Sequence, residues 1–391
     1  MHTLQQPRFS LGQISFLLFS AHLFIQSQPV LADNTQAITQ TSTQTTTVST
    51  SQVATPTTNQ PARDAALIQQ LVTAGIQPLY RELQQQSQQL TQTSTEFCST
   101  PTLENFQKLR TAWGETLLAW QRTDLLLFGP AIAEQLDFQI NFAPTKKQII
   151  KNLLASDQAI SQADIVAAGV GAQGLSSLEY VLFDREQTTE QLLAQFQEAQ
   201  GSVRCSYVQA VSALLEQKIT QLSKAWLETD STKFFTSNQE VIDLLIGKSY
   251  QTLEKINLKK IRLPFGMMDE KQLSHPYELE AWRSGYSFKT IQANIEGISR
   301  VFIDGGFLAW IDKTFPNDGT KLAVSAFEKQ LKGLIQMQLP AGDPFTVVEQ
   351  NIESPVRREL IERCRGLEMG IKRQLAIITQ AQLGFNDNDG D

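Results

Sequence analysis

Histidine is scarce in this chain, and its scarcity excludes several kinds of catalytic site. Three histidines occur among 391 residues, and two of them, His2 and His22, fall within the first 32 residues. A catalytic zinc site usually has three protein ligands with histidine prominent, and a Ser-His hydrolase needs an imidazole base. Ferritin-like di-iron bundles need Glu-x-x-His pairs, and the sequence contains none. His275 alone cannot complete these patterns, so zinc-dependent proteolysis is not expected.

The sequence also lacks a surplus of positive charge, and it lacks long runs typical of β-strands. The 33 Lys and Arg residues are outnumbered by 40 Asp and Glu residues, which gives a net charge of −7. Because nucleic-acid binding normally needs a basic patch, we predict no nucleic-acid partner. Alternating Val, Ile and Thr runs are few outside the N-terminal region, whereas Leu, Ala, Gln and Glu fill long segments. These residues favour helices, so the predicted fold class is all-α.

The apolar run nearest the N-terminus, Ile14–Ile25, is too short to cross a membrane, which takes roughly 20 residues. Arg8 precedes this run, and Val30 and Ala32 follow it at the small-residue positions of a cleavage site. We therefore predict a signal peptide over residues 1–32 and an exported mature chain without a transmembrane helix. An uncleaved anchor is the alternative. No cysteine lies near the cleavage point, so a lipid anchor is not indicated.

Charge is missing from residues 34–61, which consist mainly of Thr, Gln and Ser. Such a segment cannot bury enough apolar surface to offset the entropy lost on ordering. We predict a disordered linker over residues 33–61.

Cysteine is limited to Cys98, Cys205 and Cys364. Export permits a disulfide, and an odd count leaves one thiol over. Spacing alone does not choose among the three single pairings.

Helical periodicity begins near Ala62 and continues to the C-terminal region, with a break at residues 228–237. We predict a first helical bundle over residues 62–232 and a second over residues 233–391. Pro78 is expected to kink the first helix, and Thr102 to cap the second. Further helices are expected over residues 146–154, 189–227, 280–302, 322–337 and 355–378.

A central stretch, GLSSLEYVLFD, spans Gly174 to Asp184 and places Glu179 among apolar residues. Small, flexible residues precede it, so that a backbone or a ligand could approach closely. A lone buried carboxylate is expensive. Glu179 is therefore expected either at the edge of a helix face or paired inside the protein.

Four stretches in this order resemble the imelysin-like proteins, also classified as the M75 peptidase family. They are FCSTPTLENFQKLRTAWGETLLAWQRTDLLLFGP, GLSSLEYVLFD, EAWRSGYSFKTIQANIEGISRVF and LGFNDNDGD. The resemblance covers residues 69–391. It implies two related helical bundles in an exported bacterial protein of the periplasm or cell envelope, associated with iron uptake or iron-regulated expression.

The family signature is G-x-H-x-x-E, and this chain departs from it at one position. Gly174 and Glu179 match, but Ser176 stands where the family has histidine. Some members are described as peptidases, yet a hydroxyl is a poor zinc ligand, so we assign no catalytic residue. The resemblance also implies that Cys98 and Cys205 pair. That bridge would close a loop of roughly 100 residues and stabilise the fold by about 2–5 kcal/mol.

The candidate ligand-binding residues come from this motif and from two tryptophan–arginine groupings. Ferric iron could be held by Glu179, Tyr180 and Asp184, with Glu296 from the second half. The favoured alternative is that Glu179 pairs with an arginine, such as Arg122 or Arg283. Tryptophan beside arginine suits an anionic or planar ligand, but tryptophan at helical spacing is more commonly core. The candidates are Gly174, Ser176, Glu179, Tyr180, Asp184, Trp120, Arg122, Trp282, Arg283 and Glu296.

The function predicted from the resemblance is an exported envelope protein that binds a metal or small ligand between its two bundles. Its role would lie in iron uptake or handling, and iron is the one cofactor considered. The alternatives are a peptidase with a site that we do not recognise, and a non-enzymatic protein that docks an envelope partner at the bundle junction.

Overall fold

The computed structural model describes residues 64–383, except residues 229, 269 and 352. Every regular element in this part of the chain is helical, so the predicted all-α class is confirmed. None of the helices described is long and apolar enough to cross a membrane. The predicted signal peptide, the linker and the terminal residues 384–391 lie outside the described residues.

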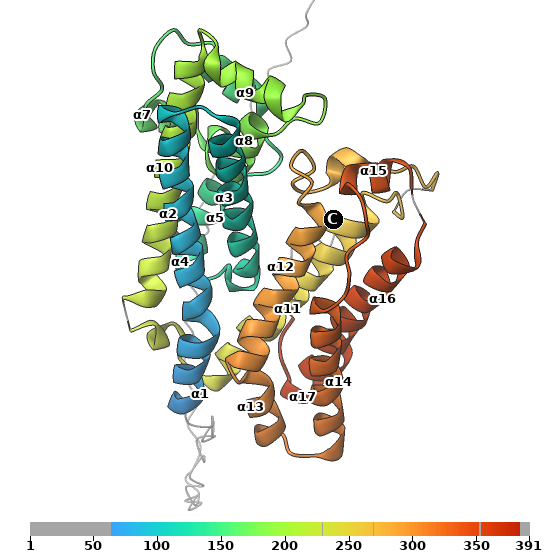
Figure 1. The fold of residues 1–391 in the computed structure, drawn as a ribbon. Helices are drawn as coiled ribbons and strands as arrows, with labels where there is room; N and C mark the ends of the chain where they lie inside the picture. The colour runs from blue at the N-terminus through green and yellow to red at the C-terminus, as the bar shows by residue number, and fades with distance from the viewer. Residues whose placement is uncertain (1–63, 229, 269, 352, 384–391) are drawn as a thin grey trace, which may run out of the picture. The chain divides into compact units, whose positions relative to one another are not determined.

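The N-terminal group of helices is built around α2, α3 and α10, which lie side by side (Figure 1). The shorter helices α5, α7, α8 and α9 pack against α10. The elements are α1 (Ala65–Gln70), η1 (Leu71–Ile76), α2 (Gln77–Ser99), α3 (Leu103–Arg122), η2 (Asp124–Leu126), α4 (Pro130–Ala133), α5 (Leu136–Ile140), α6 (Lys147–Leu154), α7 (Gln162–Ala168), η3 (Val170–Ala172), α8 (Gly174–Leu182), α9 (Thr189–Gln197), α10 (Gly201–Leu227) and η4 (Ser231–Phe234).

The C-terminal group is built around α11, α12, α14 and α16, and α12 also packs against α3 of the N-terminal group (Figure 1). The described residues form part of one compact unit, and the division into two bundles near residue 232 stays a prediction. The elements are α11 (Asn238–Lys255), η5 (Ile256–Arg262), η6 (Pro276–Glu278), α12 (Ser287–Ser299), η7 (Arg300–Asp304), α13 (Phe307–Thr314), α14 (Asp318–Ile335), α15 (Pro344–Glu349), α16 (Pro355–Gly370), η8 (Ile371–Leu375) and α17 (Ala376–Thr379).

Thr102 and Pro78, at the starts of two helices, have the roles that their chemistry predicts. Thr102 caps α3 as predicted, since its side chain accepts a hydrogen bond from the Asn105 amide. Pro78 lies in the first turn of α2, directly after the π-helical segment η1. Proline has no N–H and crowds the carbonyl four residues earlier. The wider π turn before it therefore accommodates the ring at the point where a kink was expected.

Two predicted helices are shorter in the structure. The run over residues 189–227 is divided into α9 and α10. The backbone is tightly packed at the break, since a Cβ added at Gly201 would lie 2.1 Å from the Phe196 carbonyl oxygen. The helix expected from residue 280 begins at Ser287 instead, because Ala281 and Gly285 have φ values of 53° and 76°. Left-handed backbone of this kind cannot continue a right-handed helix.

The disulfide implied by the family resemblance is confirmed. Cys98, near the end of α2, is bonded to Cys205, in the first turns of α10, with the two Cα atoms 5.5 Å apart. Cys364 is the free cysteine of the described residues and is buried. Burial raises the pKa of its thiol to about 12, so the thiolate needed for nucleophilic chemistry is strongly disfavoured.

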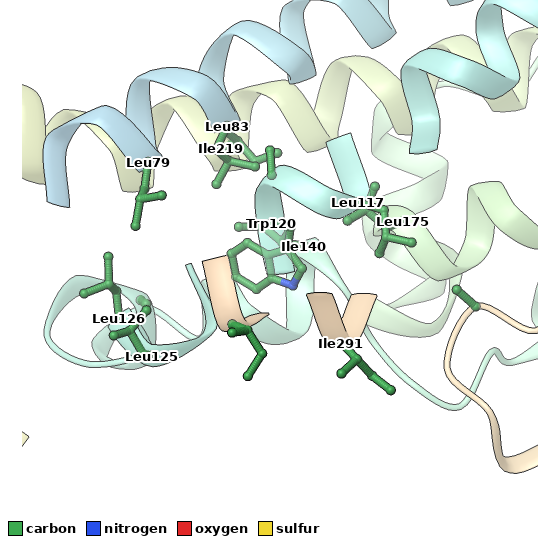
Figure 2. Packing of buried hydrophobic residues seen from close by; sticks show 14 of the residues in the cluster. Leu79, Leu83, Leu117, Trp120, Leu125, Leu126, Ile140, Leu175, Ile219 and Ile291 are labelled. Carbon is green, nitrogen blue, oxygen red and sulfur yellow. The ribbon is translucent and has the colours of Figure 1, made fainter. Parts of the chain in front are cut away.

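The apolar core continues from the N-terminal group into α12. Figure 2 shows Trp120 between Leu83 and Ile219 of the N-terminal group on one side and Ile291 of α12 on the other. The backbones meet at Gly297, where an added Cβ would lie only 2.0 Å from the Arg122 carbonyl oxygen. Only glycine allows α12 to approach the end of α3 so closely.

Substituting Gly297 with alanine is expected to destabilise the protein by about 2–3 kcal/mol, because overpacking against backbone forces the helices apart. Urea unfolding followed by circular dichroism measures the change. The matched control is Gly247→Ala in α11, where the added Cβ would meet only the Gln382 carbonyl oxygen at 3.7 Å. That change should stabilise by about 0.5–1 kcal/mol through helix propensity. Equal effects of the two substitutions would contradict the close contact between α3 and α12.

Candidate functional site

The signature helix α8 is buried, and Gly174 begins it with a φ of +75°. An added Cβ at Gly174 would lie 2.3 Å from the Ile140 carbonyl oxygen. The glycine is thus required both by its left-handed backbone and by the close approach of α5. This packing fixes the position of α8. The helix carries Glu179, one of the few buried carboxylates among the described residues.

Glu179 is 5% exposed and is held by the C-terminal half of the chain. The Ser284 amide and hydroxyl donate hydrogen bonds of 3.0 and 2.9 Å to Glu179 Oε1. Ser284 lies in the turn before α12 whose left-handed residues stop the helix from starting earlier. The interruption of the predicted helix therefore supplies the partner of the buried carboxylate.

Burial raises the pKa of Glu179, although the Ser284 hydrogen bonds and the nearby Arg283 charge favour the ionised form. The negative charge of Glu280 acts in the same direction as burial. The expected arginine partners are placed differently. Arg122 binds other carboxylates, and Arg283 influences Glu179 by its charge while Ser284 donates the hydrogen bonds.

Substituting Glu179 with glutamine is expected to increase stability at pH 7. The wild-type carboxyl has a raised pKa in the folded state, so its contribution to stability falls as pH rises from its ordinary value of 4.5 through the raised one. Glutamine keeps the oxygen that accepts from Ser284 and has no charge to bury. The gain should disappear below pH 4.5, which urea titrations across pH 4–8 would measure. Destabilisation at pH 7 would instead indicate that the negative charge is required, as an ion pair would demand.

Arg283 contacts two aromatic rings. Its guanidinium carbon lies 4.0 Å from the Trp282 ring centroid and 5.4 Å from that of Tyr180. Trp282 in turn contacts Tyr277 and Phe345, with ring centroids 5.0 and 5.6 Å away. Through the contact between Arg283 and Tyr180, the grouping of Trp282 and Arg283 lies beside the signature helix α8.

The remaining motif residues have partners elsewhere. The Ser176 hydroxyl donates a short hydrogen bond to the Phe142 carbonyl, so the residue in the histidine position is tied to the loop before α6. Asp184 accepts hydrogen bonds from the Glu186 amide and the Gln187 side chain, each at 2.9 Å. It acts as a turn residue after α8.

The other tryptophan–arginine grouping forms a separate cluster. Arg122 binds Glu296 of α12 at 2.8 Å and Glu82 of α2 at 3.1 Å, so it connects the two helix groups. Trp120 is 6% exposed and belongs to the apolar core. The structure therefore brings two of the candidates, Arg122 and Glu296, together as an ion pair.

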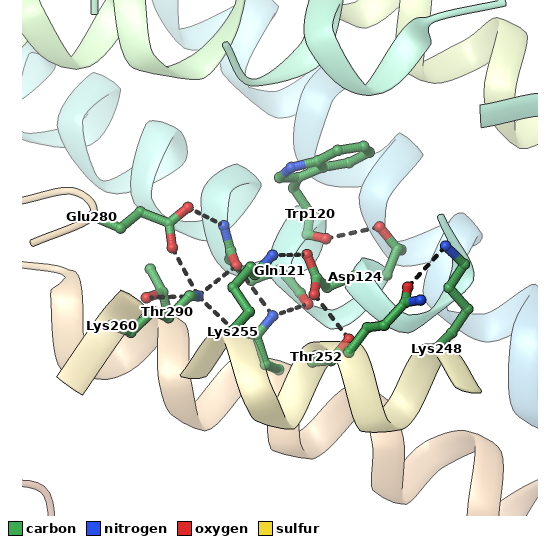
Figure 3. A network of polar contacts seen from close by, with 12 residues as sticks. Trp120, Gln121, Asp124, Lys248, Thr252, Lys255, Lys260, Glu280 and Thr290 are labelled. Atoms are coloured by element: carbon green, nitrogen blue, oxygen red, sulfur yellow. Dashed lines mark hydrogen bonds and ion pairs between the residues drawn. The ribbon is translucent and has the colours of Figure 1, made fainter. Parts of the chain in front are cut away.

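A buried polar network between the helix groups was not found from the sequence (Figure 3). Lys260 Nζ lies 2.7 Å from Glu280 and donates to Gln121 at 2.9 Å and to Asn294 at 2.6 Å. Gln121 also donates to Glu280 at 2.8 Å. Lys260 is 5% exposed, and its ammonium is fully surrounded by acceptors from three elements.

A second lysine extends this network toward α3. Lys255 forms a short ion pair with Asp124, which also accepts from Thr252 at 2.9 Å. Burial disfavours the ionised form of Asp124, but the charges of Lys255 and Lys260 outweigh it, so the pKa of Asp124 is lowered. Burial and the repulsion of Lys255 outweigh the attraction of Glu280 at Lys260, whose pKa is also lowered.

The sequence signal for this network is weak because it depends on a π-helical segment. Lys255 and Lys260 are five residues apart, which places them on different faces of an α-helix. They lie at the junction of α11 and the π segment η5, and i→i+5 bonding brings residues five apart closer to one face. Figure 3 shows both ammonium groups directed at the end of α3.

The described residues do not fit a bare iron ion at Glu179. No group of three or more His, Cys, Asp or Glu side chains suited to a metal occurs in the part of the chain that the structure describes. Of the oxygen ligands considered, Asp184 is bound in its turn and Glu296 is paired with Arg122. The cation Arg283 lies 5.4 Å from the Tyr180 ring centroid, where its positive charge would repel a metal ion.

Similarity to known proteins covers most of the chain. A family model described as imelysin (peptidase M75) matches residues 76–368. The fold is similar to that of an imelysin-like protein from Psychrobacter arcticum 273-4, with a TM-score of 0.66 and 19% identity over 82% of this chain and 96% of that one. No curated protein matches significantly.

A second similar structure is described as an iron-regulated protein A precursor from Parabacteroides distasonis ATCC 8503. Its TM-score is 0.60 at 16% identity, over 83% of this chain and 96% of that one. At such identities the two structures establish a shared fold.

Proposed function

The chain belongs to the imelysin family, and from this premise we propose that it is an exported bacterial envelope protein that binds a ligand where its two helix groups meet. We place its role in iron uptake or handling. The description of the Parabacteroides relative as iron-regulated supports that role by analogy.

The observation that carries the ligand-binding proposal is the junction at Glu179. A buried carboxylate of α8 in the N-terminal half is bonded to Ser284 of the C-terminal half, beside a half-buried arginine in contact with two aromatic rings. Charged groups are expensive to bury, and the long chain has ample apolar residues for a purely structural contact. A functional requirement at the junction accounts for the presence of these two charged groups there.

Growth under iron limitation tests the cellular role. Deletion of the gene should slow growth when iron is chelated and have no effect when iron is plentiful, and a plasmid copy should restore growth. Cell fractionation of the native bacterium should recover the protein in the periplasmic or envelope fraction. Equal growth of deletion and parent strains under iron limitation would exclude the iron role. Cleavage of a protein substrate by the purified chain would favour the peptidase alternative.

A further inference from the structure

Arg283 is a charged group whose hydrogen-bonding capacity is unused within the described residues. Its guanidinium carries five N–H donors, yet it forms no hydrogen bond or ion pair with any residue of the described chain, although the side chain is partly buried. Arg185, on the same aromatic cluster, shows the contrast. It stacks on Phe345 at 4.0 Å and is paired with Asp343 at 2.5 Å.

The contacts of Arg283 with aromatic rings leave its N–H groups available to a ligand. The guanidinium carbon lies 4.0 Å from the Trp282 ring centroid and 5.4 Å from that of Tyr180, and no described residue accepts a hydrogen bond from it. A planar guanidinium with free donors matches the two oxygens of a carboxylate. The rings also fix the side chain before any ligand arrives, which lowers the entropy lost on binding.

A second cation lies beside the Trp282 ring. Lys147, an exposed residue at the start of α6, has its ammonium 5.9 Å from that ring. Glu179 and Asp184 are the acidic groups that act on Arg283 by their charges, and both already accept hydrogen bonds from other residues. The Trp282 ring thus has two cations beside it, although the whole chain has a net charge of −7.

We infer that Tyr180, Trp282, Arg283 and Lys147 form a site for a small organic anion that binds through carboxylate groups. The carboxylate would accept two hydrogen bonds from Arg283, Lys147 would lie near a second acidic group, and Trp282 would cover the apolar part. This inference rests on the proposed ligand-binding function and specifies its ligand. If that ligand carries iron, the metal would arrive inside an anionic carboxylate chelate, because Arg283 and Lys147 repel a bare cation.

Calorimetric titration of the purified mature chain tests the assignment with three probes: citrate, its ferric chelate, and ferrous ion under anaerobic conditions. Wild type should bind citrate, the chelate, or both, and a difference between them identifies whether the free acid or the metal complex is the ligand. Arg283→Gln should weaken that binding at least 10-fold. Arg283→Lys should have an intermediate effect, since lysine keeps the charge and loses the planar fork.

Arg300→Gln is the matched control, because it removes the same charge from an exposed arginine paired with Asp304 and should change the affinity less than 2-fold. Circular dichroism establishes that each variant is folded. Unchanged binding in Arg283→Gln, or binding of ferrous ion alone, would overturn the anion site and leave a ligand-binding function standing. Failure of folded wild type to bind any probe would overturn the anion site, and the growth test under iron limitation would then decide the iron role separately. Loss of citrate binding in Arg283→Gln with no iron-limited growth defect on deletion would keep the anion site and exclude the iron role.

Discussion

Replacing Lys260 with methionine is expected to lower the free energy of unfolding by about 3–5 kcal/mol, the usual cost of removing one partner of a buried ion pair. Methionine fills much of the volume of the lysine stem, so little cavity forms. The loss comes from the acceptors that remain. Glu280, Gln121 and Asn294 each lose a contact of 2.6–2.9 Å with the ammonium.

The exposure of Glu280 places the expected loss toward the lower end of that range. Its side chain is 27% exposed, against 5% for Lys260, so water can partly solvate the carboxylate after the lysine is removed. A second substitution, Glu280→Gln, removes the uncompensated charge. The double variant Lys260→Met/Glu280→Gln should therefore be more stable than Lys260→Met alone.

A double-mutant cycle in urea measures this coupling. Both single variants, the double variant and wild type are unfolded under the same conditions, with circular dichroism as the signal. A loss of less than 1 kcal/mol in Lys260→Met, or strict additivity of the two substitutions, would show that the network does not hold the helix groups together.

Removal of the disulfide is expected to cost about 2–5 kcal/mol, because the bond shortens the unfolded chain across a long loop. Cys98 and Cys205 are 107 residues apart in sequence. The bridge ties the end of α2 to the start of α10, two helices that pack along much of their length. The variant Cys98→Ser/Cys205→Ser should keep the fold, since that packing remains, and should unfold at a lower urea concentration.

Reductant provides the control for this prediction. Dithiothreitol should lower the stability of wild type to nearly that of Cys98→Ser/Cys205→Ser and should leave the double variant unchanged. Cys364 is buried and present in both proteins, so it cancels from the comparison. Equal stability of oxidised and reduced wild type would mean that the bridge contributes nothing to folding.

Much of the fold could be predicted because it depends on local chemistry. Leu and Ala at helical spacing, with few β-type runs, are sufficient for an all-α chain, and Thr102 caps α3 through a contact three residues away. The pairing of Cys98 with Cys205 came from the family resemblance, since spacing alone left three choices. The signature stretch forms a helix, and Glu179 is paired inside the protein, one of the two placements that its chemistry left open.

The partners of that carboxylate could not be predicted. Residues 179 and 284 are 105 positions apart, and the hydrogen bond requires the left-handed turn that ends the expected helix early. The stretch from Glu280 to Phe302 has helical periodicity, and no other local feature is strong enough to predict the break in the helix. The positive φ at Ala281 in particular has no sequence signature, because alanine seldom adopts it.

The sequence by itself determined the helical class, the signature helix and the scarcity of metal ligands, since each follows from residue type and short-range spacing. Only the tertiary structure decided that Ser284 holds Glu179, that Arg122 pairs with Glu296, and that Arg283 has no hydrogen-bond partner among the described residues. These outcomes depend on which side chains meet across α3, α8 and α12. Such meetings are set by long-range packing, such as the contact at Gly297, and composition and periodicity do not encode them.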